Sequence, residues 1–217
     1  MRTILPSVVP FAGPGIAVVV FSTELNMRII SGSQRGRKLL GPRGSSARPA
    51  LDSIREAVFN ILSSQVEGAR VLDLFCGVGA FGLEALSRGA RTGHFVDNSP
   101  ASLAVLQRNI ELLGFAAFVS VEQRDAYGFG DCAEAAYDLI FVDPPFPVFK
   151  EEAGAERVFT MAQRLLSPQP GSTKRTMVLR LPSWYRQEPP LRTDDRRVYG
   201  RSAVLFLSST GEASGST

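Results

Sequence analysis

The stretch Val71-Leu72-Asp73-Leu74-Phe75-Cys76-Gly77-Val78-Gly79-Ala80-Phe81-Gly82 decides the fold of this 217-residue chain. Its first five residues form an apolar run typical of a buried strand, and the glycines predict a tight turn that opens a helix through Leu86. Strand, glycine-rich turn and helix form the first unit of a nucleotide-binding α/β fold. Glycine lets the backbone approach a ligand closely, and N–H groups at a helix start can bind its polar end. We therefore expect a ligand at this turn.

Three more strands are predicted at residues 92–96, 118–122 and 137–142, followed by a fifth at 176–181 and two closing strands at 197–200 and 203–207. Helices are predicted at 99–113 and 151–166. Each of the first four strands ends in or near an acid, namely Asp73, Asp97, Asp125 and Asp143. Any one of these acids is commonly a turn residue. Because ligands bind at the carboxyl ends of strands in open α/β sheets, the four together would line one reactive edge.

The fourth strand is followed by Asp143-Pro144-Pro145-Phe146. The prolines restrict the backbone, so the Asp143 carboxylate and the Pro144 carbonyl are held as adjacent acceptors. Phe146 adds a flat apolar face. Two acceptors beside a stacking face suit a planar heterocycle that carries an exocyclic amine. The structural alternative is an ordinary Asp-Pro turn after a strand.

Composition favours a globular α/β protein, with 44% apolar residues. Charge is distributed unevenly, because residues 28–55 hold six arginines and one lysine against a single acid, Asp52. A polyanion is the partner expected for such a segment, and a solvated basic face is the alternative. The two cysteines, Cys76 and Cys132, fit a reducing cytosol without a disulfide framework. Neither has a metal-ligand neighbour, so no metal site is expected, and His94 lies in a strand pattern typical of a structural role.

The chain divides into four expected segments. Residues 1–26 are predicted to be an unstructured start-site extension, with the natural start at Met27. A membrane-spanning helix needs about 20 uninterrupted apolar residues, and Pro6, Pro10 and Pro14 interrupt the apolar run in this segment. Residues 27–66 would form a basic arm, with a short hairpin at 28–40 and a docking helix at 51–63. Residues 67–208 would form the main domain. Residues 209–217 are expected to be a disordered tail.

Two motifs leave alternatives open. Residues 77–82 match the dinucleotide pattern G-x-G-x-x-G, and Asp97 falls 20 residues after Gly77, so a nicotinamide-dependent oxidoreductase is a rival. Hydride transfer offers no use for Asp73, Asp125 or residues 143–146. Trp184 and Tyr185 lie between two arginines and could either contact RNA or pack in the core.

Several segments together resemble the RsmD family of bacterial S-adenosylmethionine-dependent methyltransferases, which modify N2 of one guanine in 16S ribosomal RNA. These segments are Met27–Gly32, Gly36–Leu39, Arg48-Pro49 with Asp52, Arg55–Leu62, Val71–Ala90 and Asp143–Phe146. The resemblance implies a Rossmann-like class I methyltransferase with a seven-stranded, mostly parallel sheet, helices on both faces and a small N-terminal basic hairpin and helix appendage. It also implies a cytoplasmic monomer that acts on 16S rRNA in the small subunit or an assembly intermediate, without a membrane.

The same resemblance assigns residues to the cofactor and the RNA. S-adenosylmethionine would be held by Asp73, Phe75, Cys76, Gly77 and Gly79 at its methionine end, by Asp97 and Asn98 at the ribose, and by Asp125 and Ala126 at the adenine. Asp143, Pro144, Pro145 and Phe146 would hold the target guanine. Arg35, Arg37, Lys38, Arg48 and Arg55 would contact RNA phosphates, with an ion pair to Asp52 or Glu56 as the alternative for Arg55. The family usually has a small residue at position 76, Ser or Thr at 78 and Thr at 50, where this chain has Cys76, Val78 and Ala50.

Physical chemistry agrees with that assignment. The lone pair of a guanine amine is delocalised into the ring, and acceptors at Asp143 and Pro144 can draw its hydrogens aside and aim the lone pair at a methyl donor. Good orientation can supply about 7–11 kcal/mol of a barrier. Another amino-methyltransferase acting on adenine N6 in RNA or DNA, and a nucleotide-dependent RNA-binding module without catalysis, remain the alternatives.

Overall fold

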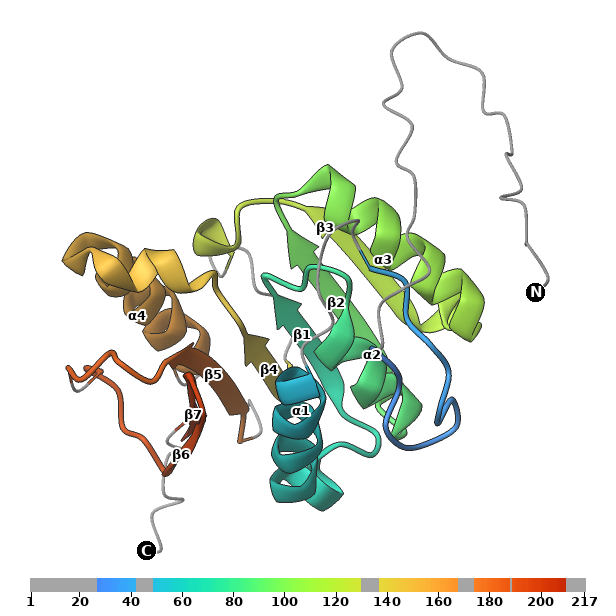
Figure 1. The fold of residues 1–217 in the computed structure, drawn as a ribbon, viewed down its shortest axis with the longest axis horizontal. Helices are drawn as coiled ribbons and strands as arrows, with labels where there is room; N and C mark the ends of the chain where they lie inside the picture. The colour runs from blue at the N-terminus through green and yellow to red at the C-terminus, as the bar shows by residue number, and fades with distance from the viewer. Residues whose placement is uncertain (1–26, 42–48, 130–136, 168–173, 188, 210–217) are drawn as a thin grey trace, which may run out of the picture.

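A computed structural model describes residues 27–41, 49–129, 137–167, 174–187 and 189–209 (Figure 1). The predictions for residues 1–26, for Arg48, for Cys132 and for the tail beyond Ser209 lie outside these residues.

The described residues form one seven-stranded sheet in the order β3-β2-β1-β4-β5-β7-β6. The strands are β1 (Arg70–Leu74), β2 (Thr92–Asp97), β3 (Val119–Gln123), β4 (Leu139–Val142), β5 (Thr176–Pro182), β6 (Asp195–Tyr199) and β7 (Ser202–Ser208). β7 runs antiparallel to both of its neighbours, whereas β3, β2, β1, β4 and β5 are parallel. The mostly parallel, seven-stranded prediction is confirmed.

β1 and β4 mark the point where the strand order reverses. The chain moves from β1 outward to β2 and β3, then returns to place β4 on the other side of β1 (Figure 1). The loops after these two strands therefore diverge and leave a crevice, which is where open α/β sheets bind ligands. The glycine turn follows β1 and residues 143–146 follow β4. The fold thus brings both predicted motifs to this reversal.

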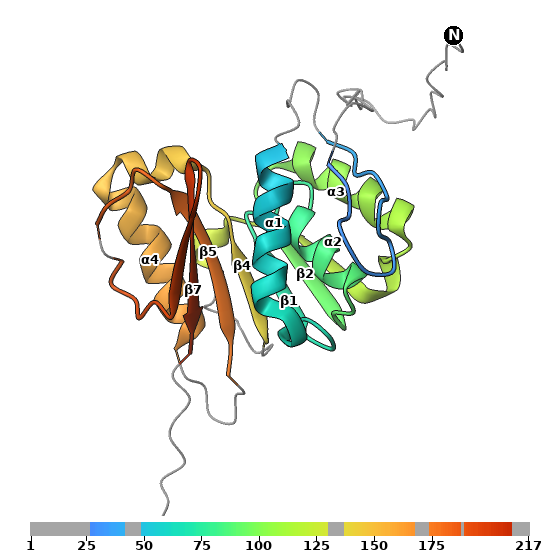
Figure 2. The same cartoon turned by 60° about the horizontal axis from the view of Figure 1, so that its bottom comes forward.

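Helices cover both faces of the sheet at its central strands β1, β4 and β5, which are apolar on both sides. Leu72 and Leu74 face α4 (Glu152–Leu166), whereas Val71 and Phe141 face α1 (Pro49–Leu62). Figure 2 shows α4 and α1 on opposite sides of β4 and β5. On the α1 side, α2 (Ala80–Ser87) and α3 (Pro100–Leu113) enclose Phe95 of β2.

Local sequence explains where α3 begins and ends. The Ser99 hydroxyl accepts a hydrogen bond from the Ser102 N–H at 3.2 Å, and Pro100 follows it at the first helical position. Gly114 ends the helix in the left-handed conformation, with φ 73°. The helix predicted at residues 99–113 is therefore confirmed.

The arm at residues 27–41 is a closed loop with one bridge between Arg28 and Lys38. Ile29 donates its N–H to the Arg37 carbonyl at 2.9 Å, so the predicted hairpin pairing exists over one bridge and not along two regular strands. At Gly32, with φ +86°, a Cβ would lie 1.8 Å from the Ser87 carbonyl oxygen, so only glycine allows this approach to α2.

A buried carboxylate holds the arm on α2. Glu84, fully buried, accepts hydrogen bonds from the N–H groups of Ile30 (2.7 Å) and Ser31 (3.0 Å). Glu84 also pairs with Arg88 at 2.7 Å. The apolar side chains of Ile29 and Leu39 are buried against the helices. Polar and apolar contacts together fix the arm on the main domain. Among the residues that the structure describes, no helix has the length and apolar character needed to cross a membrane.

Candidate active site

Asp73 lies inside β1 beneath the glycine turn, 2% exposed, and its Oδ2 accepts the Gly82 N–H at 2.9 Å. Burial raises the pKa of Asp73 to about 7, with smaller contributions from the charges of Asp143 and Asp97, and the hydrogen bond from Gly82 opposes the rise. A carboxyl group with such a pKa becomes a stable anion when a cationic group is placed beside it. Asp73 can therefore hold the ammonium end of a ligand.

Asp97 at the end of β2 is fixed by two backbone donors. Its Oδ2 accepts from the Gly77 N–H and its Oδ1 from the Ser99 N–H, each at 2.8 Å. Each carboxylate oxygen keeps a lone pair for a further donor. The two backbone hydrogen bonds orient Asp97 at the glycine turn, where its carboxylate can accept hydrogen bonds from the two hydroxyls of a ribose.

The three glycines of the turn have different roles. At Gly77, with φ +54°, an added Cβ would meet nothing within 4 Å, so this backbone faces open space. At Gly79 the same carbon would lie 2.4 Å from Leu106, and at Gly82 it would lie 2.3 Å from Phe95. Gly79 also uses its N–H internally, on the Cys76 carbonyl at 2.8 Å. Close ligand approach is therefore available at Gly77, whereas Gly79 and Gly82 allow helix packing.

An aromatic corner borders the turn. The Phe75 ring lies 5.2 Å from the Tyr127 ring, and Phe75 has the unusual φ of 57°. Asp125 begins the short helix η3 (Ala126–Gly128) by accepting the Tyr127 N–H at 3.1 Å, and Ala126 is buried. The predicted adenine-binding residues Asp125 and Ala126 therefore lie on the segment that also brings Tyr127 against Phe75 of the glycine turn.

Asp143 lies directly beside the glycine turn. Its N–H points at the Leu74 carbonyl, 3.4 Å away, at the end of β1. Arg180, two residues before the end of β5, donates two hydrogen bonds to the Asp143 carboxylate, Nε to Oδ1 at 2.6 Å and a terminal nitrogen to Oδ2 at 3.0 Å. Burial raises the pKa of Asp143 and the Arg180 guanidinium opposes that rise. The pair holds the carboxylate in one orientation.

Phe146 completes this group. The Arg180 guanidinium carbon lies 4.7 Å from the Phe146 ring centroid, in cation–π geometry, and the same guanidinium donates to the Ser202 hydroxyl of β7 at 3.1 Å. Pro144 is buried and Pro145 is exposed between them. Acceptor and stacking face therefore lie together, as the sequence predicts.

Arg180 and Ser202 are site residues that sequence reasoning missed. The parallel pairing of β4 with β5 sets Val142 opposite Leu179, and continuing that register by one residue sets Asp143 opposite Arg180. Knowledge of the strand pairing could therefore have found Arg180. Nothing in the sequence near Ser202 marks it, because β7 reaches the site through antiparallel pairing.

The predicted RNA-binding residues do not gather around Asp143. Arg35, Arg37 and Lys38 are exposed, but Arg37 donates to the Leu112 carbonyl (2.6 Å) at the carboxyl end of α3. That end lies a helix length of about 20 Å from the start of α3 beside Asp97. The tip of the arm is therefore at the opposite edge of the sheet from the reactive groups.

Arg55 is corrected to a structural residue. Its side chain is 2% exposed, and it pairs with Asp52 at 3.1 Å and with Glu84 at 3.5 Å. It also donates to the Arg28 carbonyl, which ties α1 to the arm. Burial lowers its pKa, and Asp52 and Glu84 oppose this. A guanidinium enclosed in this way cannot contact an RNA phosphate.

Cys76 and His94 have structural surroundings. Cys76 is 8% exposed, and burial raises the pKa of its thiol, so it is a poor nucleophile. His94 contacts the Tyr137 hydroxyl at 2.6 Å and Glu122 at 3.4 Å, and burial lowers its pKa. In the described part of the chain, no group of three or more His, Cys, Asp or Glu side chains could hold a metal ion.

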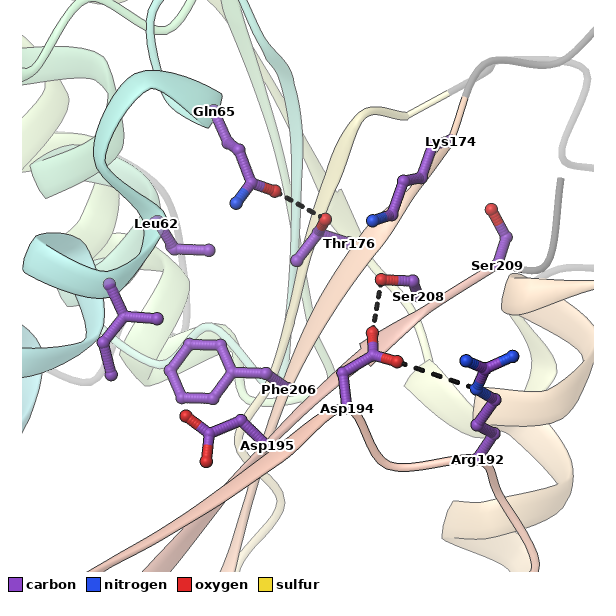
Figure 3. Close-up of a pocket in the computed structure, with 11 residues that line it drawn as sticks. Leu62, Gln65, Lys174, Thr176, Arg192, Asp194, Asp195, Phe206, Ser208 and Ser209 are labelled. Carbon is purple, nitrogen blue, oxygen red and sulfur yellow. Dashed lines mark hydrogen bonds and ion pairs between the residues drawn. The ribbon is translucent and has the colours of Figure 1, made fainter.

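A cavity of about 520 Å³, shown in Figure 3, is lined by none of these groups. It opens near Thr176 at the start of β5 and Ser208 at the end of β7, hence at the amino-terminal edge of the parallel strands. Within it, Asp194 accepts a hydrogen bond from Ser208 and pairs with Arg192 at 3.9 Å. We assign it no part in the chemistry.

A family model described as "Conserved hypothetical protein 95" matches residues 27–173. "Ribosomal RNA small subunit methyltransferase D" of Escherichia coli K12 is 39% identical over 120 residues, which cover 55% of this chain and 60% of that protein. YlbH of Bacillus subtilis, named provisionally as an rRNA methyltransferase, is 38% identical over 130 residues, 58% of this chain and 71% of that protein. The chain belongs to the RsmD family.

Solved structures agree with this RsmD assignment. The E. coli protein yhhF, titled provisionally as a methyltransferase, superposes with a TM-score of 0.69 at 29% identity, covering 84% of this chain and 97% of that one. The sequence alignments span 71% of the B. subtilis protein and 60% of the E. coli protein. The Rossmann-like methyltransferase fold predicted from the sequence is confirmed.

Proposed function

We propose that this RsmD-family protein transfers a methyl group from S-adenosylmethionine to the exocyclic N2 amine of a guanine in 16S ribosomal RNA. One observation carries the proposal. Asp143, with Phe146 beside it, follows β4 directly alongside the glycine turn of β1, and the Asp143 N–H points at the Leu74 carbonyl, 3.4 Å away. The proposed site for the methyl donor and the proposed site for the target amine therefore share one crevice, as a direct transfer between two bound molecules requires.

The groups around the glycine turn fit this cofactor. Asp73 can take the ammonium group, the open backbone at Gly77 allows close approach, and the doubly anchored Asp97 can take the ribose hydroxyls. Asp125 and Ala126 would border the adenine next to Phe75 and Tyr127. When bound, S-adenosylmethionine supplies a methyl group activated by its sulfonium.

The protein's task at the target base is orientation. The carboxylate of Asp143 and the carbonyl of Pro144 would accept hydrogen bonds from the amine, which turns its lone pair out of conjugation with the ring. Arg180 keeps the Asp143 carboxylate in place. Phe146 would stack on the flipped base. The methylated nitrogen would lose one proton to the Asp143 carboxylate or to water, and S-adenosylhomocysteine would be the other product.

The rival interpretations are less well supported. A nicotinamide oxidoreductase has no use for an anchored carboxylate and an aromatic face at the end of β4. An adenine N6 methyltransferase would use the same acceptors, so that alternative is separated by substrate. The names of the relatives, which specify ribosomal RNA, favour the RNA substrate.

We place the reaction in the cytoplasm, on the small ribosomal subunit or an assembly intermediate, with the protein acting as a monomer. The exposed Arg35, Arg37 and Lys38 would contact the RNA backbone about one helix length from the reactive crevice. A substrate as large as a subunit can span that distance.

The deciding experiment offers labelled S-adenosylmethionine with naked 16S rRNA, unmethylated small subunits, or DNA, and identifies the modified base by nucleoside mass spectrometry. We expect N2-methylguanosine in RNA. Label in N6-methyladenine, or in DNA, would replace the proposal with the corresponding alternative.

A further inference from the structure

A cavity of about 540 Å³ opens beside the reactive crevice and shares Phe146 and Arg180 with it. Its other walls come from the start of α1, from the turn after β5 and from the β6–β7 turn, through Leu51, Trp184, Tyr199 and Arg201. This volume falls within the roughly 300–1,000 Å³ typical of small-ligand sites. The groups assigned above to the target base and the cofactor leave most of this cavity without a role.

Trp184 is the main aromatic surface of the cavity. Its side chain is 51% exposed, whereas the neighbouring Tyr185 is 7% exposed and packs on Phe149 at 5.4 Å. The structure thus separates two residues that the sequence could not distinguish. Tyr185 belongs to the core, and Trp184 presents an indole to solvent at a cavity wall. An exposed indole in a basic setting is suited to stacking on a nucleobase.

The position of Trp184 is fixed by the β6–β7 turn. Ser183 donates its N–H to the Arg201 carbonyl at 2.9 Å, which joins the two turns. Arg201 is exposed, and among the described residues no carboxylate pairs with its side chain. The cavity rim therefore combines a stacking face with an available cation, which is the chemistry that binds a base together with its phosphate.

We propose that this cavity takes the base of a nucleotide next to the target guanine in the RNA strand, stacked on Trp184, with a nearby phosphate on Arg201. The inference rests on the proposed function and adds a second base-binding site to it. A guanine that enters the reactive crevice must leave its stack, so its neighbour loses a stacking partner, and sequence-specific RNA recognition commonly captures such unstacked bases. Phe146 and Arg180 form the shared wall between the two sites.

The kinetic test compares Trp184→Ala with Trp184→Phe. A base stacked on an aromatic residue contributes about 1–3 kcal/mol, so Trp184→Ala should raise the KM for RNA by about 5- to 150-fold. The affinity for S-adenosylmethionine should stay within about twofold, and Trp184→Phe should recover most of the RNA affinity. Val198→Ala is the matched control, because Val198 is 59% exposed on β6 and does not line the cavity.

A second readout does not depend on turnover. The chain contains one tryptophan, so its intrinsic tryptophan fluorescence reports on this cavity. We expect a synthetic RNA hairpin carrying the mapped target guanine to quench the fluorescence of the Asp143→Asn variant. The same hairpin with an abasic nucleotide beside the target should quench much less.

The outcomes separate the two proposals. Wild-type methylation with an unchanged KM in Trp184→Ala and no quenching by RNA would overturn the neighbouring-base site and leave the proposed function intact. Quenching that disappears when the target guanine itself is abasic, and persists when its neighbour is, would also overturn it, because the cavity would then hold the target. If the modified base that is mapped is not a guanine, and quenching depends on the nucleotide beside that base, the proposed guanine specificity alone would be overturned.

Discussion

Arg180 of β5 donates to both carboxylate oxygens of Asp143, at 2.6 Å and 3.0 Å, and so joins β5 to the residue that follows the parallel strand β4. The same guanidinium lies 4.7 Å from the Phe146 ring centroid. It thus contacts both groups that would bind the target base. A carboxylate positioned before the base arrives loses less conformational freedom on binding, which favours catalysis by orientation.

Replacement of Arg180 tests this role. Arg180→Ala removes a charge-assisted pair of roughly 1.5–3 kcal/mol, so we expect kcat to fall by about 10- to 150-fold. Because Arg180 lowers the pKa of Asp143, its loss should also move the acidic limb of the kcat–pH profile to higher pH. The kcat of Arg180→Lys should lie between those of Arg180→Ala and the wild type. A faster Arg180→Ala enzyme would instead show that the guanidinium obstructs the base.

Asp143→Ala should lower kcat by two orders of magnitude or more while leaving the affinity for S-adenosylmethionine nearly unchanged. The reason is that Asp143 would contact the target amine and not the cofactor. Asp143→Asn, which keeps the shape and one acceptor, should retain more activity. Single-turnover methylation and equilibrium dialysis provide the two measurements, and equal methylation rates for Asp143→Ala and wild type would refute the assignment.

Asp73 should make the stability of the cofactor-free protein depend on pH. Its folded-state pKa of about 7 lies above the ordinary value of 3.8, so the folded protein holds this proton more tightly than the unfolded chain does. The free energy of unfolding should therefore fall as pH rises from about 4 to about 7, by at most about 1.4 kcal/mol per unit. Asp73→Asn keeps an acceptor for the Gly82 N–H and should flatten this slope. Thermal melts between pH 5 and pH 8 would show the difference, and parallel slopes for the two proteins would contradict it.

Substitutions at Arg35 and Arg55 should have different effects, with the first lowering RNA affinity and the second lowering the stability of the fold. Arg55→Met removes one of the two guanidinium partners of buried Glu84, the other being Arg88, and should destabilise the protein by up to about 3–5 kcal/mol. Arg35→Ala changes an exposed side chain and should leave the melting temperature within a degree or two, but lower RNA affinity and reduce the salt slope by about one phosphate contact. Calorimetry and salt-dependent RNA binding test both, and an unchanged salt slope for Arg35→Ala would remove the arm from the RNA interface.

Gly77→Ala and Gly36→Ala form a matched pair. Both glycines have positive φ, +54° and +81°, and an added Cβ would meet nothing within 4 Å at either position. Each substitution should therefore cost stability by about 1 kcal/mol or more through backbone strain. Only Gly77→Ala should weaken S-adenosylmethionine binding, measured by titration calorimetry. Equal cofactor affinities in the two variants would show that Gly77 is not at the cofactor.

Local patterns in the sequence were sufficient to predict the strands and the reactive edge. Apolar runs and glycine or proline boundaries located β1, β4 and β5, because strands buried on both faces of a parallel sheet are continuously apolar. Asp97 and Asp143 follow from the same patterns, since each lies at the carboxyl end of a strand. The N-terminal hairpin was less regular than expected because Ile30 and Ser31 donate to Glu84 of α2 and not to a partner strand.

Interactions between distant segments could not be predicted in the same way. In the sequence, Arg55 is one of several cations in a basic segment. In the structure it is buried, because it pairs with the buried carboxylate of Glu84 in α2. The Asp143–Arg180 pair joins residues that are 37 positions apart in the sequence. Trp184 and Tyr185 are adjacent aromatic residues, yet Tyr185 is buried in the core and Trp184 is exposed. Charge and spacing along the chain do not predict which of these residues are buried or paired, because tertiary packing determines both.

The hydrogen bond from Arg180 to Ser202 gives β7 a part in the site. β7 lies between β5 and β6, so a variant truncated before Ser202 would leave β5 without its antiparallel neighbour. Such a variant would expose an unpaired strand edge, which invites aggregation. We therefore expect truncation before β7 to cost solubility and to remove one of the hydrogen bonds that orient Arg180 toward Asp143.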